Sequence, residues 1–412
     1  MTPPSSTISH IKTSSSTQKK HQLLKKRHLY RGVVKKKKVS TQVSMLPPSS
    51  PVLPYSGTFI RDRWMEIAKE TQSIVLGDGQ YVEERRVPIV PCALAQRIEG
   101  FSANPLGQVD SSTTVAVTHN ISEQIQQSRL GTTFYPHQSE VLAEWRTPPA
   151  QIPRPLHKPR REFTHQSTLV AARRLAHHAP PTSPNVGVLS FASRKKPGGN
   201  FLHGSDEQED RIARYSSLVA SLDCPQAKEF YDEHRHFWSQ DGSGFIDHSM
   251  VYSPSVVVFR EDGDNRTSLG GSFIPPYLID VLSVVPVNVA VVRARYSSAS
   301  EKEADEAVRQ TMKERMARAL RVFEERGNRT VVLGAFGCTS SENKLDVVAS
   351  IWAELLVCGD MEGEGRSKRP ARFKKSFDNV VFAVPGKSFS AFKEAFDNRL
   401  FEAQIVDGML SD

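Results

Sequence analysis

The sequence predicts an α/β fold, with a central sheet covered by helices on both faces. Short apolar runs such as "VGVLSFA" (186–192) and "TVVLGAFG" (330–337) are typical of buried strands. Helical stretches with one apolar face alternate with these runs, which is the pattern of a sheet packed between helix layers. Two of the strands run directly into glycine-rich turns that precede a helix, and such turns are common ligand sites in this class of fold.

The chain has 412 residues, enough for one large domain or two smaller ones, and its composition of 24% charged and 38% hydrophobic residues indicates a mostly globular protein. Its net charge of +9 is concentrated at one end. Residues 1–60 hold eleven of the 54 Lys and Arg residues and none of the 45 acidic ones, so the rest of the chain, with 43 basic residues, has a net charge of −2. The sequence therefore does not indicate a nucleic-acid surface spread over the folded body.

Residues 1–58 are rich in Ser, Thr, Pro and Lys, which predicts a disordered basic tail. The run of lysines at 35–38 fits a nuclear import signal or a phosphate-binding patch, and the acid-free, Ser-rich start fits a mitochondrial transit peptide. A plain solvated tail fits equally well. We expect an intracellular protein of the nucleus, cytoplasm or mitochondrion, with no membrane span and no secretory signal.

The first half of the globular part predicts few elements. The stretch beginning "RDRWMEIAKETQSIVL" (61–76) predicts a helix that ends near the glycines at 77 and 79. Residues 95–160 are mixed in character and proline-rich near their end, which predicts irregular structure. "HQSTLVAARRLAHH" (165–178) predicts another helix. We therefore expect an accessory region over 59–160, with helical and irregular structure, ahead of a main domain over 161–410.

The second half alternates regularly. Further strands are predicted at 255–261, 281–287 and 379–384, and helices at 303–327, 343–357 and 388–401. The segment "GDMEGEGRSKRPAR" (359–372) predicts an exposed loop. The four cysteines, at positions 92, 224, 338 and 358, match no zinc-binding spacing and are expected to be thiols in a reducing compartment. Nothing in the sequence calls for a metal or a cofactor.

The first glycine turn, "SRKKPGGNFLHG" (193–204), follows the predicted strand at 186–192. Its glycines allow a positive φ angle or a close approach of the backbone to a ligand. Ser205 lies three residues before Gln208, a capping-box spacing that predicts a helix start at about Ser205. A stripe of apolar residues then predicts one continuous helix whose core face carries Ile212, Tyr215, Val219 and Leu222.

The second glycine turn lies in "TVVLGAFGCTSSEN" (330–343) and leads to a helix that begins near Asn343. Free backbone N–H groups in such turns bind phosphate oxygens, and two turns that meet at one sheet edge suit a diphosphate. A tight strand–helix connection explains either turn equally well, since neither is a Walker A motif or a G-x-G-x-x-G motif.

Four acids surround the start of the helix after the first turn. Asp206 and Glu207 are explained by the favourable helix dipole alone. Glu209 and Asp210 lie at the border between the core stripe and the turn, where partial loss of hydration shifts a carboxyl group towards use as an acid.

The residues of the first glycine turn and the helix after it resemble a known family. "VLSFASRKKPGGNFLHGSDEQEDRIARYSSLVASL" (188–222) is similar to the signature of the microbial-type poly(ADP-ribose) glycohydrolases, a macrodomain-related group. Similar blocks follow the family order: "AKET" and "GDGQY" within 66–81, "STLVAARRL" (167–175), "VYSPSVVVFRED" (251–262) and "VVLGAFGC" (331–338). The resemblance covers roughly residues 61–400. It implies a macrodomain-like three-layer α/β/α fold with a mixed central sheet, an N-terminal helical extension and hydrolysis of poly(ADP-ribose).

The resemblance also implies a site that binds ADP-ribose. Gln208 and Glu209 would orient a ribose, Asp210 would stand at the catalytic position, and Phe336 would cover the sugar or base or be a buried apolar plug. The predicted catalytic residues are Asp210 and Glu209, and the predicted ligand-binding residues are Ser190, Ala192, Gly198, Gly199, Asn200, Gln208, Gly334, Ala335, Phe336, Gly337 and Cys338.

Four positions depart from the family pattern. Asn200 replaces the third Gly, Ser190 and His203 each replace an Asn, and Asp210 replaces the catalytic Glu. Asp is shorter by one bond, roughly 1.5 Å, a displacement that costs on the order of a hundredfold in rate. The resemblance as a whole nevertheless implies an enzyme that releases ADP-ribose from poly(ADP-ribose), and this is the expected function. The alternatives are a reader that binds ADP-ribose with little or no catalysis, and a hydrolase of single ADP-ribose groups on proteins. The basic tail is expected to attract polyanions such as the polymer.

Overall fold

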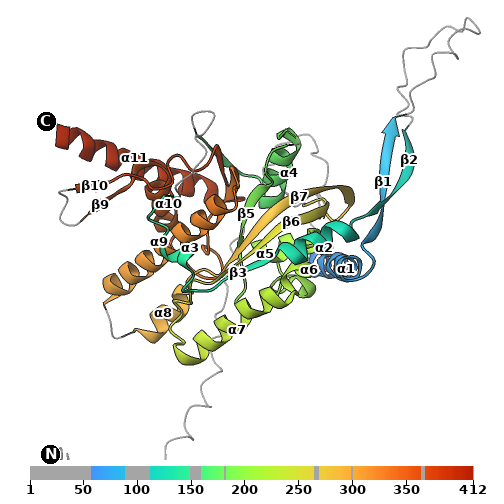
Figure 1. Ribbon diagram of the computed structural model, residues 1–412, viewed down its shortest axis with the longest axis horizontal. Helices are drawn as coiled ribbons and strands as arrows, with labels where there is room; N and C mark the ends of the chain where they lie inside the picture. The colour runs from blue at the N-terminus through green and yellow to red at the C-terminus, as the bar shows by residue number, and fades with distance from the viewer. Residues whose placement is uncertain are drawn as a thin grey trace, which may run out of the picture. The chain divides into compact units, whose positions relative to one another are not determined.

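Strands and helices alternate along the chain, as Figure 1 shows. The structure is a computed structural model that describes residues 57–88, 112–148, 159–180, 182–263, 269–297, 300–362 and 367–411. All of them lie within one compact unit, Val52–Asp412. The predicted basic tail lies outside the described residues, apart from residues 57 and 58.

The elements of the first half contain the helical extension and the first glycine turn. In chain order they are α1 (Gly57–Leu76), β1 (Gln80–Pro88), β2 (Ser112–Asn120), α2 (Ser122–Gly131), β3 (Thr133–Tyr135), α3 (Glu140–Ala143), β4 (Arg160–Thr164), α4 (Thr168–His178), β5 (Val186–Phe191), the 3₁₀ turn η2 (Phe201–His203), α5 (Gln208–Tyr215), α6 (Leu218–Leu222) and α7 (Pro225–Gln240).

The elements of the second half complete the sheet. They are β6 (Met250–Arg260), β7 (Phe273–Val284), α8 (Val289–Arg295), α9 (Glu301–Glu325), β8 (Thr330–Leu333), α10 (Leu345–Ala353), the π-helical turn η3 (Glu354–Cys358), β9 (Asp360–Glu362), β10 (Ser367–Arg369), β11 (Asn379–Ala383) and α11 (Ser388–Ser411). None of the helices among the described residues combines the length and the apolar composition needed to span a membrane.

One sheet of seven strands has the order β3-β6-β7-β5-β8-β11-β4. The strands β7, β5, β8, β11 and β4 run parallel, whereas β6 runs antiparallel to both of its neighbours. The predicted mixed sheet is therefore confirmed. Because β6 is reversed, its first residue, Met250, pairs with Val284 at the end of β7, so the segment that leads into β6 reaches the edge where the parallel strands end.

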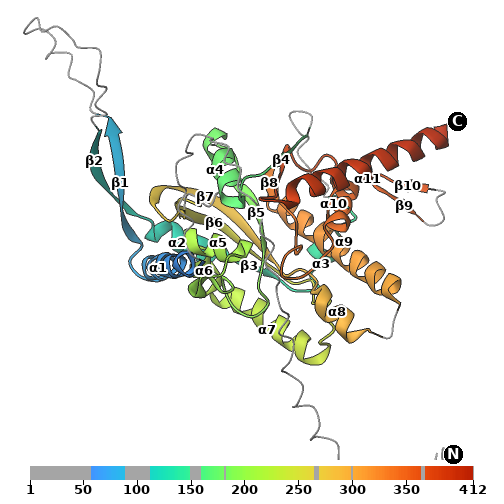
Figure 2. The same cartoon turned by 180° about the vertical axis from the view of Figure 1, so that it is seen from behind.

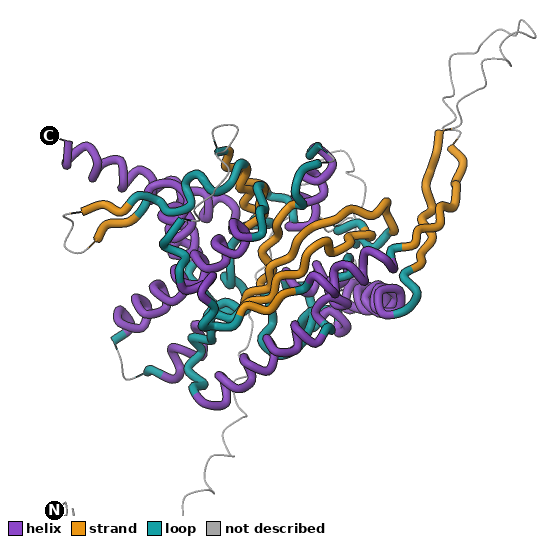
Figure 3. The backbone as a smooth tube through the Cα atoms, viewed as in Figure 1, coloured by secondary structure: helices purple, strands orange, loops and turns teal. Residues whose placement is uncertain are grey.

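Helices cover the sheet on both faces, and Figures 2 and 3 show the two helix layers with the strands between them. Alternate side chains along each strand point to opposite faces, so neighbouring residues enter different cores. On β5, Val188 packs with α4, α5, α6 and α7, whereas Leu189 packs with α3, α8, α9, α10 and α11. The predicted α/β/α layering is confirmed.

Two segments that were predicted to lack regular structure contain strands and helices. Residues 95–160 were expected to be irregular, but their described part contains β2, α2, β3 and α3. The short helix α2 buries only Ile125 and Ser128, so it has no apolar stripe to detect. β3 pairs with β6, so the accessory region 59–160 supplies an edge strand of the main sheet. Within the predicted loop 359–372, β9 and β10 form a short hairpin.

The predicted continuous helix after the first turn is broken, and it starts later than expected. It consists of α5 and α6, separated at Ser216 and Ser217. The amide of Ser217 donates to Val257 O at 2.8 Å, and its hydroxyl accepts from Val257 N at 2.9 Å. Because these bonds join the chain to β6, the helix is interrupted while its core-facing stripe is kept.

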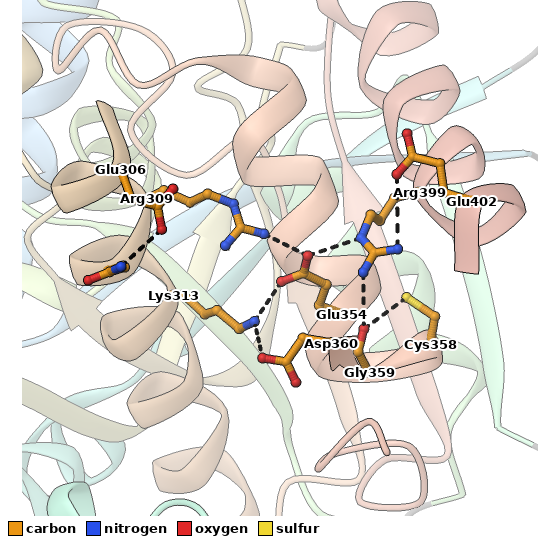
Figure 4. Close-up of polar contacts among 10 residues, drawn as sticks. Glu306, Arg309, Lys313, Glu354, Cys358, Gly359, Asp360, Arg399 and Glu402 are labelled. Atoms are coloured by element: carbon orange, nitrogen blue, oxygen red, sulfur yellow. Dashed lines mark hydrogen bonds and ion pairs between the residues drawn. The ribbon is translucent and has the colours of Figure 1, made fainter. Parts of the chain in front are cut away.

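A buried carboxylate joins several elements on the α9 side of the sheet. Glu354, in η3, is only 5% exposed and lies between Arg309 and Lys313 of α9 and Arg399 of α11 (Figure 4). Its oxygens accept from these three cations at 2.6, 2.7 and 3.0 Å respectively. Lys313 also bonds Asp360 at 2.6 Å, so β9 belongs to the same network.

Replacing this carboxylate leaves three cations without their shared partner. We expect Glu354→Gln to lower the free energy of unfolding by about 3 kcal/mol, since removal of one member of a buried ionic network leaves uncompensated charge. Glu402→Gln is the matched control, because Glu402 is 4.0 Å from Arg399 and its side chain is 68% exposed. Urea denaturation measures both effects. Equal stability of the two variants would contradict this assignment.

Candidate functional site

The two glycine turns lie at the ends of neighbouring strands. Turn 1 (residues 193–207) follows β5 and turn 2 (residues 334–344) follows β8, and these strands are adjacent and parallel. The hydroxyl of Thr339 in turn 2 donates to Glu207 Oε2 in turn 1 at 2.8 Å. The predicted convergence of the two turns at one edge of the sheet is thus confirmed.

Turn 1 brings its backbone directly against the carboxyl groups of α5. Gly198 and Gly199 have φ angles of +67° and +60°. A Cβ atom on Gly199 would clash with Asp210 Oδ1 and would lie 3.1 Å from Glu209 Oε2. Only a residue without a side chain allows the turn to close on these two carboxyl groups.

This packing predicts a large effect of one methyl group. We expect Gly199→Ala to lower the free energy of unfolding by about 2 to 4 kcal/mol through a strained φ angle and a steric clash. Gly386→Ala is the matched control, because Gly386 has a φ angle of +76° and a Cβ atom added there would meet no other atom within 4 Å, so it reports the strain alone. Thermal denaturation of both variants measures the difference, and equal losses would show that the contact with Asp210 contributes nothing.

Asp210 is buried within the protein and holds turn 1 in shape. Its Oδ1 accepts from the amide of Asn200 at 2.7 Å, and its Oδ2 accepts from the amide of Glu207 at 3.1 Å. With Glu207 it forms the capping box that starts α5, which was predicted for Ser205 and Gln208. The side chain is 2% exposed, and each of its carboxylate oxygens already accepts a backbone hydrogen bond.

Glu209 is held differently. Its Oε2 accepts from the amide of Ser193 at 2.6 Å, whereas its buried Oε1 has no partner among the described residues. Burial, with a smaller contribution from the charge of Asp210, raises the pKa of Glu209 to about 8. This shift favours the protonated carboxyl group at neutral pH, although the backbone of Ser193 and of Gly198 lowers the pKa in part. Oε1 is the carboxyl oxygen without a hydrogen-bond partner among the described residues.

Other polar atoms near Glu209 also lack partners within the described part of the chain. The hydroxyl of Tyr231, on α7, is buried without a hydrogen bond, and burial, with a smaller contribution from the charge of Glu209, raises its pKa. The hydroxyl of Ser190, a predicted ligand residue on β5, is likewise buried and unpaired. Buried polar atoms without partners are uncommon and are a feature of ligand sites.

The other predicted residues of turn 1 have structural contacts. The side-chain amide of Gln208 accepts from Phe191 N at 2.9 Å and donates to Leu189 O at 2.8 Å, so it completes the hydrogen bonding at the end of β5. Ala192 is buried and donates its amide to Val284 O. Sequence spacing gave no sign of the contact between Gln208 and β5, because its partners lie 17 and 19 residues earlier in the chain.

Turn 2 presents free amides. The backbone N–H groups of Ala335 and Gly337 have no partner among the described residues, whereas the carbonyl of Gly334 accepts from Trp352 Nε1 at 3.0 Å. Gly337 has a φ angle of +70°, and a Cβ atom there would lie 2.7 Å from Asn343 Nδ2. These amides are donors of the kind that bind phosphate oxygens.

The side chains of turn 2 face the core. Phe336 is 0% exposed and packs edge to face on Phe191, with ring centroids 5.4 Å apart. It is therefore a buried apolar plug, the second of its two predicted roles. Burial raises the pKa of the Cys338 thiol to about 12, so the sulfur is a neutral thiol at neutral pH. The part of the chain that the structure describes has no group of three or more His, Cys, Asp or Glu side chains that could hold a metal ion.

A cavity elsewhere does not compete with this site. It has a volume of about 950 Å³ and is lined by residues of α9, η3 and the segment that contains Arg372, and none of them belongs to either glycine turn. Its cations are already paired: Lys313 with Glu354 and Asp360, and Arg372 with Glu324. We therefore place the candidate site at the glycine turns.

Comparisons with known proteins agree with this geometry. Residues 108–261, which include turn 1 and α5, match the family described as microbial-type PARG, catalytic domain. No curated protein matches the chain.

Solved structures match over most of the chain. Poly(ADP-ribose) glycohydrolase from Thermomonospora curvata is 28% identical, with a TM-score of 0.59 over 82% of this chain and 99% of that one. Its complex with the inhibitor ADP-HPD has a TM-score of 0.58 at 28% identity over 82% and 100% of the two chains. The Deinococcus radiodurans enzyme in complex with ADP-ribose is 28% identical, with a TM-score of 0.52 over 67% and 96%. The resemblance seen in the sequence is thereby confirmed: this chain carries the microbial-type PARG catalytic-domain signature within the fold of the bacterial poly(ADP-ribose) glycohydrolases.

Proposed function

We propose that the chain hydrolyses the ribose–ribose O-glycosidic bonds of poly(ADP-ribose) and releases ADP-ribose. The observation that carries this proposal is Glu209, a buried carboxyl group with a raised pKa and one free oxygen, between two glycine turns at adjacent strand ends. The solved structures of similar bacterial glycohydrolases with ADP-ribose and with the inhibitor ADP-HPD support the same ligand class.

The free amides of turn 2 bind the diphosphate of the terminal ADP-ribose unit. Backbone N–H groups of Ala335 and Gly337, which have no partner among the described residues, donate to its oxygens. Turn 1 then lies beside the ribose that follows the diphosphate. The uncommitted Oε1 of Glu209 and the hydroxyl of Ser190 are the polar atoms available to the sugar.

Glu209 supplies the proton for bond cleavage. It protonates the leaving ribose oxygen as the bond to the anomeric carbon breaks and that ribose gains oxocarbenium character. The resulting carboxylate then accepts a proton from the water that attacks the anomeric carbon, which regenerates the acid. A neighbouring phosphate offsets the positive charge of the sugar. Asp210 holds turn 1 in place through the amide of Asn200. In this proposal Glu209 therefore has the catalytic role that the family pattern gives to position 210, and Asp210 has a supporting role.

A reader of ADP-ribose is the second candidate. It is favoured by one observation, namely that Asp210, at the family's catalytic position, uses both of its oxygens for backbone contacts. Hydrolysis of single ADP-ribose groups on proteins is a third possibility, which a comparison of substrates separates from the first.

Incubation of the purified protein with automodified polymerase tests the proposal. We expect release of free ADP-ribose and shortening of the polymer. Binding of the polymer without release identifies a reader, and release from singly modified protein alone identifies the third activity. The basic tail over residues 1–58 adds electrostatic attraction for the polymer and an address to the nucleus or the mitochondrion, both as proposals that rest on its lysines.

A further inference from the structure

Arg194 is a half-buried cation in turn 1 that has no acidic partner in the described part of the chain. It follows Ser193, whose amide binds Glu209, and its guanidinium carbon lies 3.6 Å from the centre of the Trp238 ring. Arg194 makes no hydrogen bond or ion pair with any described residue. Arg211, also largely covered, behaves differently, because it bonds Asp206 at 2.9 Å.

The environment of Arg194 favours an anionic ligand. Burial lowers the pKa of its side chain, and no carboxylate opposes this effect. A guanidinium group that lies over an indole ring keeps its N–H donors in its own plane, where they can match two oxygens of a phosphate. Lys195 and Lys196 follow as exposed cations without a carboxylate partner within the described residues, so this segment of turn 1 is strongly positive.

Arg194 and turn 2 approach Glu209 from different elements. Turn 2 extends β8, on one side of β5 in the sheet order. Trp238 lies near the end of α7, which contacts β3 and β6 on the other side of β5 and β7 (Figures 1 and 2). The amide of Ser193 bonds the carboxyl group of Glu209, which in the proposed reaction protonates the leaving oxygen. Arg194 follows Ser193 directly in the chain, so it is a cation beside that contact.

We propose that Arg194, which lies over the ring of Trp238, binds a phosphate of the ADP-ribose unit on the leaving side of the cleaved bond. This inference rests on the proposed function. In the polymer the leaving group is a further ADP-ribose unit with its own diphosphate, whereas in a singly modified protein it is an amino-acid side chain. Arg194 therefore favours the polymer over a singly modified protein as substrate. The terminal ADP-ribose unit is bound by turn 2 and by the residues around Glu209.

The test compares Arg194→Met and Arg194→Lys with the parent protein. We expect Arg194→Met to lower kcat/KM for polymer about tenfold, mostly through KM, because one charge-assisted phosphate contact is lost. Binding of free ADP-ribose, measured by calorimetry, should stay within about twofold, since ADP-ribose lacks the leaving unit. Arg194→Lys should recover part of the loss, because it keeps the charge without the planar fork.

Two further variants complete the design. Trp238→Leu removes the stacking surface and should weaken polymer hydrolysis less than Arg194→Met, because the cation remains. Arg235→Met is the matched control, since Arg235 is an exposed arginine of α7 that pairs with Asp232 on the same helix, and it should leave both measurements unchanged.

The outcomes separate this inference from the proposed function. If Arg194→Met weakens ADP-ribose binding as much as it weakens polymer hydrolysis, Arg194 belongs to the terminal-unit site and the inference is wrong. An unchanged kcat/KM for polymer overturns it equally. If the parent protein releases no ADP-ribose, the proposed function fails. The inference about Arg194 can still be decided by binding. Competition between labelled polymer and free ADP-ribose, measured for the parent and the Arg194→Met proteins, shows whether Arg194 binds the second unit.

Discussion

Glu209→Gln should abolish release of ADP-ribose while leaving ADP-ribose binding nearly intact. The amide side chain has almost the same volume, and its carbonyl oxygen still accepts from the amide of Ser193, a bond of 2.6 Å in the parent protein. It has no acidic proton to give to the leaving oxygen. Loss of general acid catalysis corresponds to a fall in kcat of about 10²- to 10⁴-fold, which release of ADP-ribose from polymer measures directly.

Glu207→Gln is the matched control for this substitution. Glu207 lies at the same helix start, but it is exposed, and its side chain accepts from Thr339 at 2.8 Å and takes part in the capping box of α5. We expect its kcat to fall by less than about tenfold. Hydrolysis by Glu209→Gln at the parent rate would remove Glu209 from the reaction, whereas loss of binding together with rate would make it a residue for ligand affinity.

The raised pKa of Glu209 gives the same substitution a signature in stability. A glutamate in an unfolded chain has a pKa of about 4.3, whereas in the folded protein the value is about 8. Between these pH values the unfolded chain has released a proton that the folded protein keeps. The contribution of Glu209 to the free energy of unfolding is therefore largest below about pH 4. It decreases by about 1.4 kcal/mol for each pH unit as the pH rises towards 8.

Glutamine does not titrate, so the stability of Glu209→Gln relative to the parent protein should increase between pH 5 and pH 8. Urea denaturation at the two pH values measures this change. The catalytic rate of the parent protein should fall as the pH rises above about 8, because the acid loses its proton. A difference in stability that is independent of pH would show that Glu209 is ionised in the folded protein at neutral pH.

The position of the site was predictable from the sequence, but the division of work between its carboxyl groups was not. A strand followed by a glycine turn and a helix places the turn at the sheet edge, and the alternation of such units makes neighbouring strands parallel. For this reason the pattern placed both turns at the edge of the sheet where the strands end. The adjacency of β5 and β8, which are separated in the chain by β6 and β7, comes from the sheet order of the structure. The roles of Glu209 and Asp210 depend on which backbone amides face them, namely those of Ser193 and Asn200.

Local rules failed where a tertiary contact replaced them. Ser205 and Gln208 have the spacing of a capping box, but Gln208 bonds the end of β5, and Glu207 and Asp210 cap the helix instead. The stripe of apolar residues after turn 1 was identified correctly, whereas the break at Ser217 was not, because its cause is a pair of hydrogen bonds to β6, forty residues later in the chain.

Asp210→Asn should impair the protein for a different reason from Glu209→Gln. Both oxygens of Asp210 accept backbone N–H groups, from Asn200 at 2.7 Å and from Glu207 at 3.1 Å. An amide has only one oxygen, so its NH₂ group must face one of these donors. A buried donor left without an acceptor costs about 1 to 3 kcal/mol, and turn 1, with Gly199 packed on this side chain, loses its anchor.

The pH profile distinguishes this loss from the loss of the acid. Asp210→Asn should have a lower thermal midpoint and a reduced rate, but its residual activity should still decline as the pH rises, because burial continues to raise the pKa of Glu209. The decline should begin at a lower pH than in the parent protein, because the charge of Asp210 no longer contributes to that pKa. In Glu209→Gln that decline should be absent from any remaining activity. If instead Asp210→Asn keeps the parent's thermal midpoint and loses both hydrolysis and the pH-dependent decline, Asp210 is the proton donor and Glu209 only orients the sugar. The unpaired Oε1 of Glu209 and the doubly bonded carboxylate of Asp210 favour the first outcome, because a reacting oxygen must be free to bond the substrate.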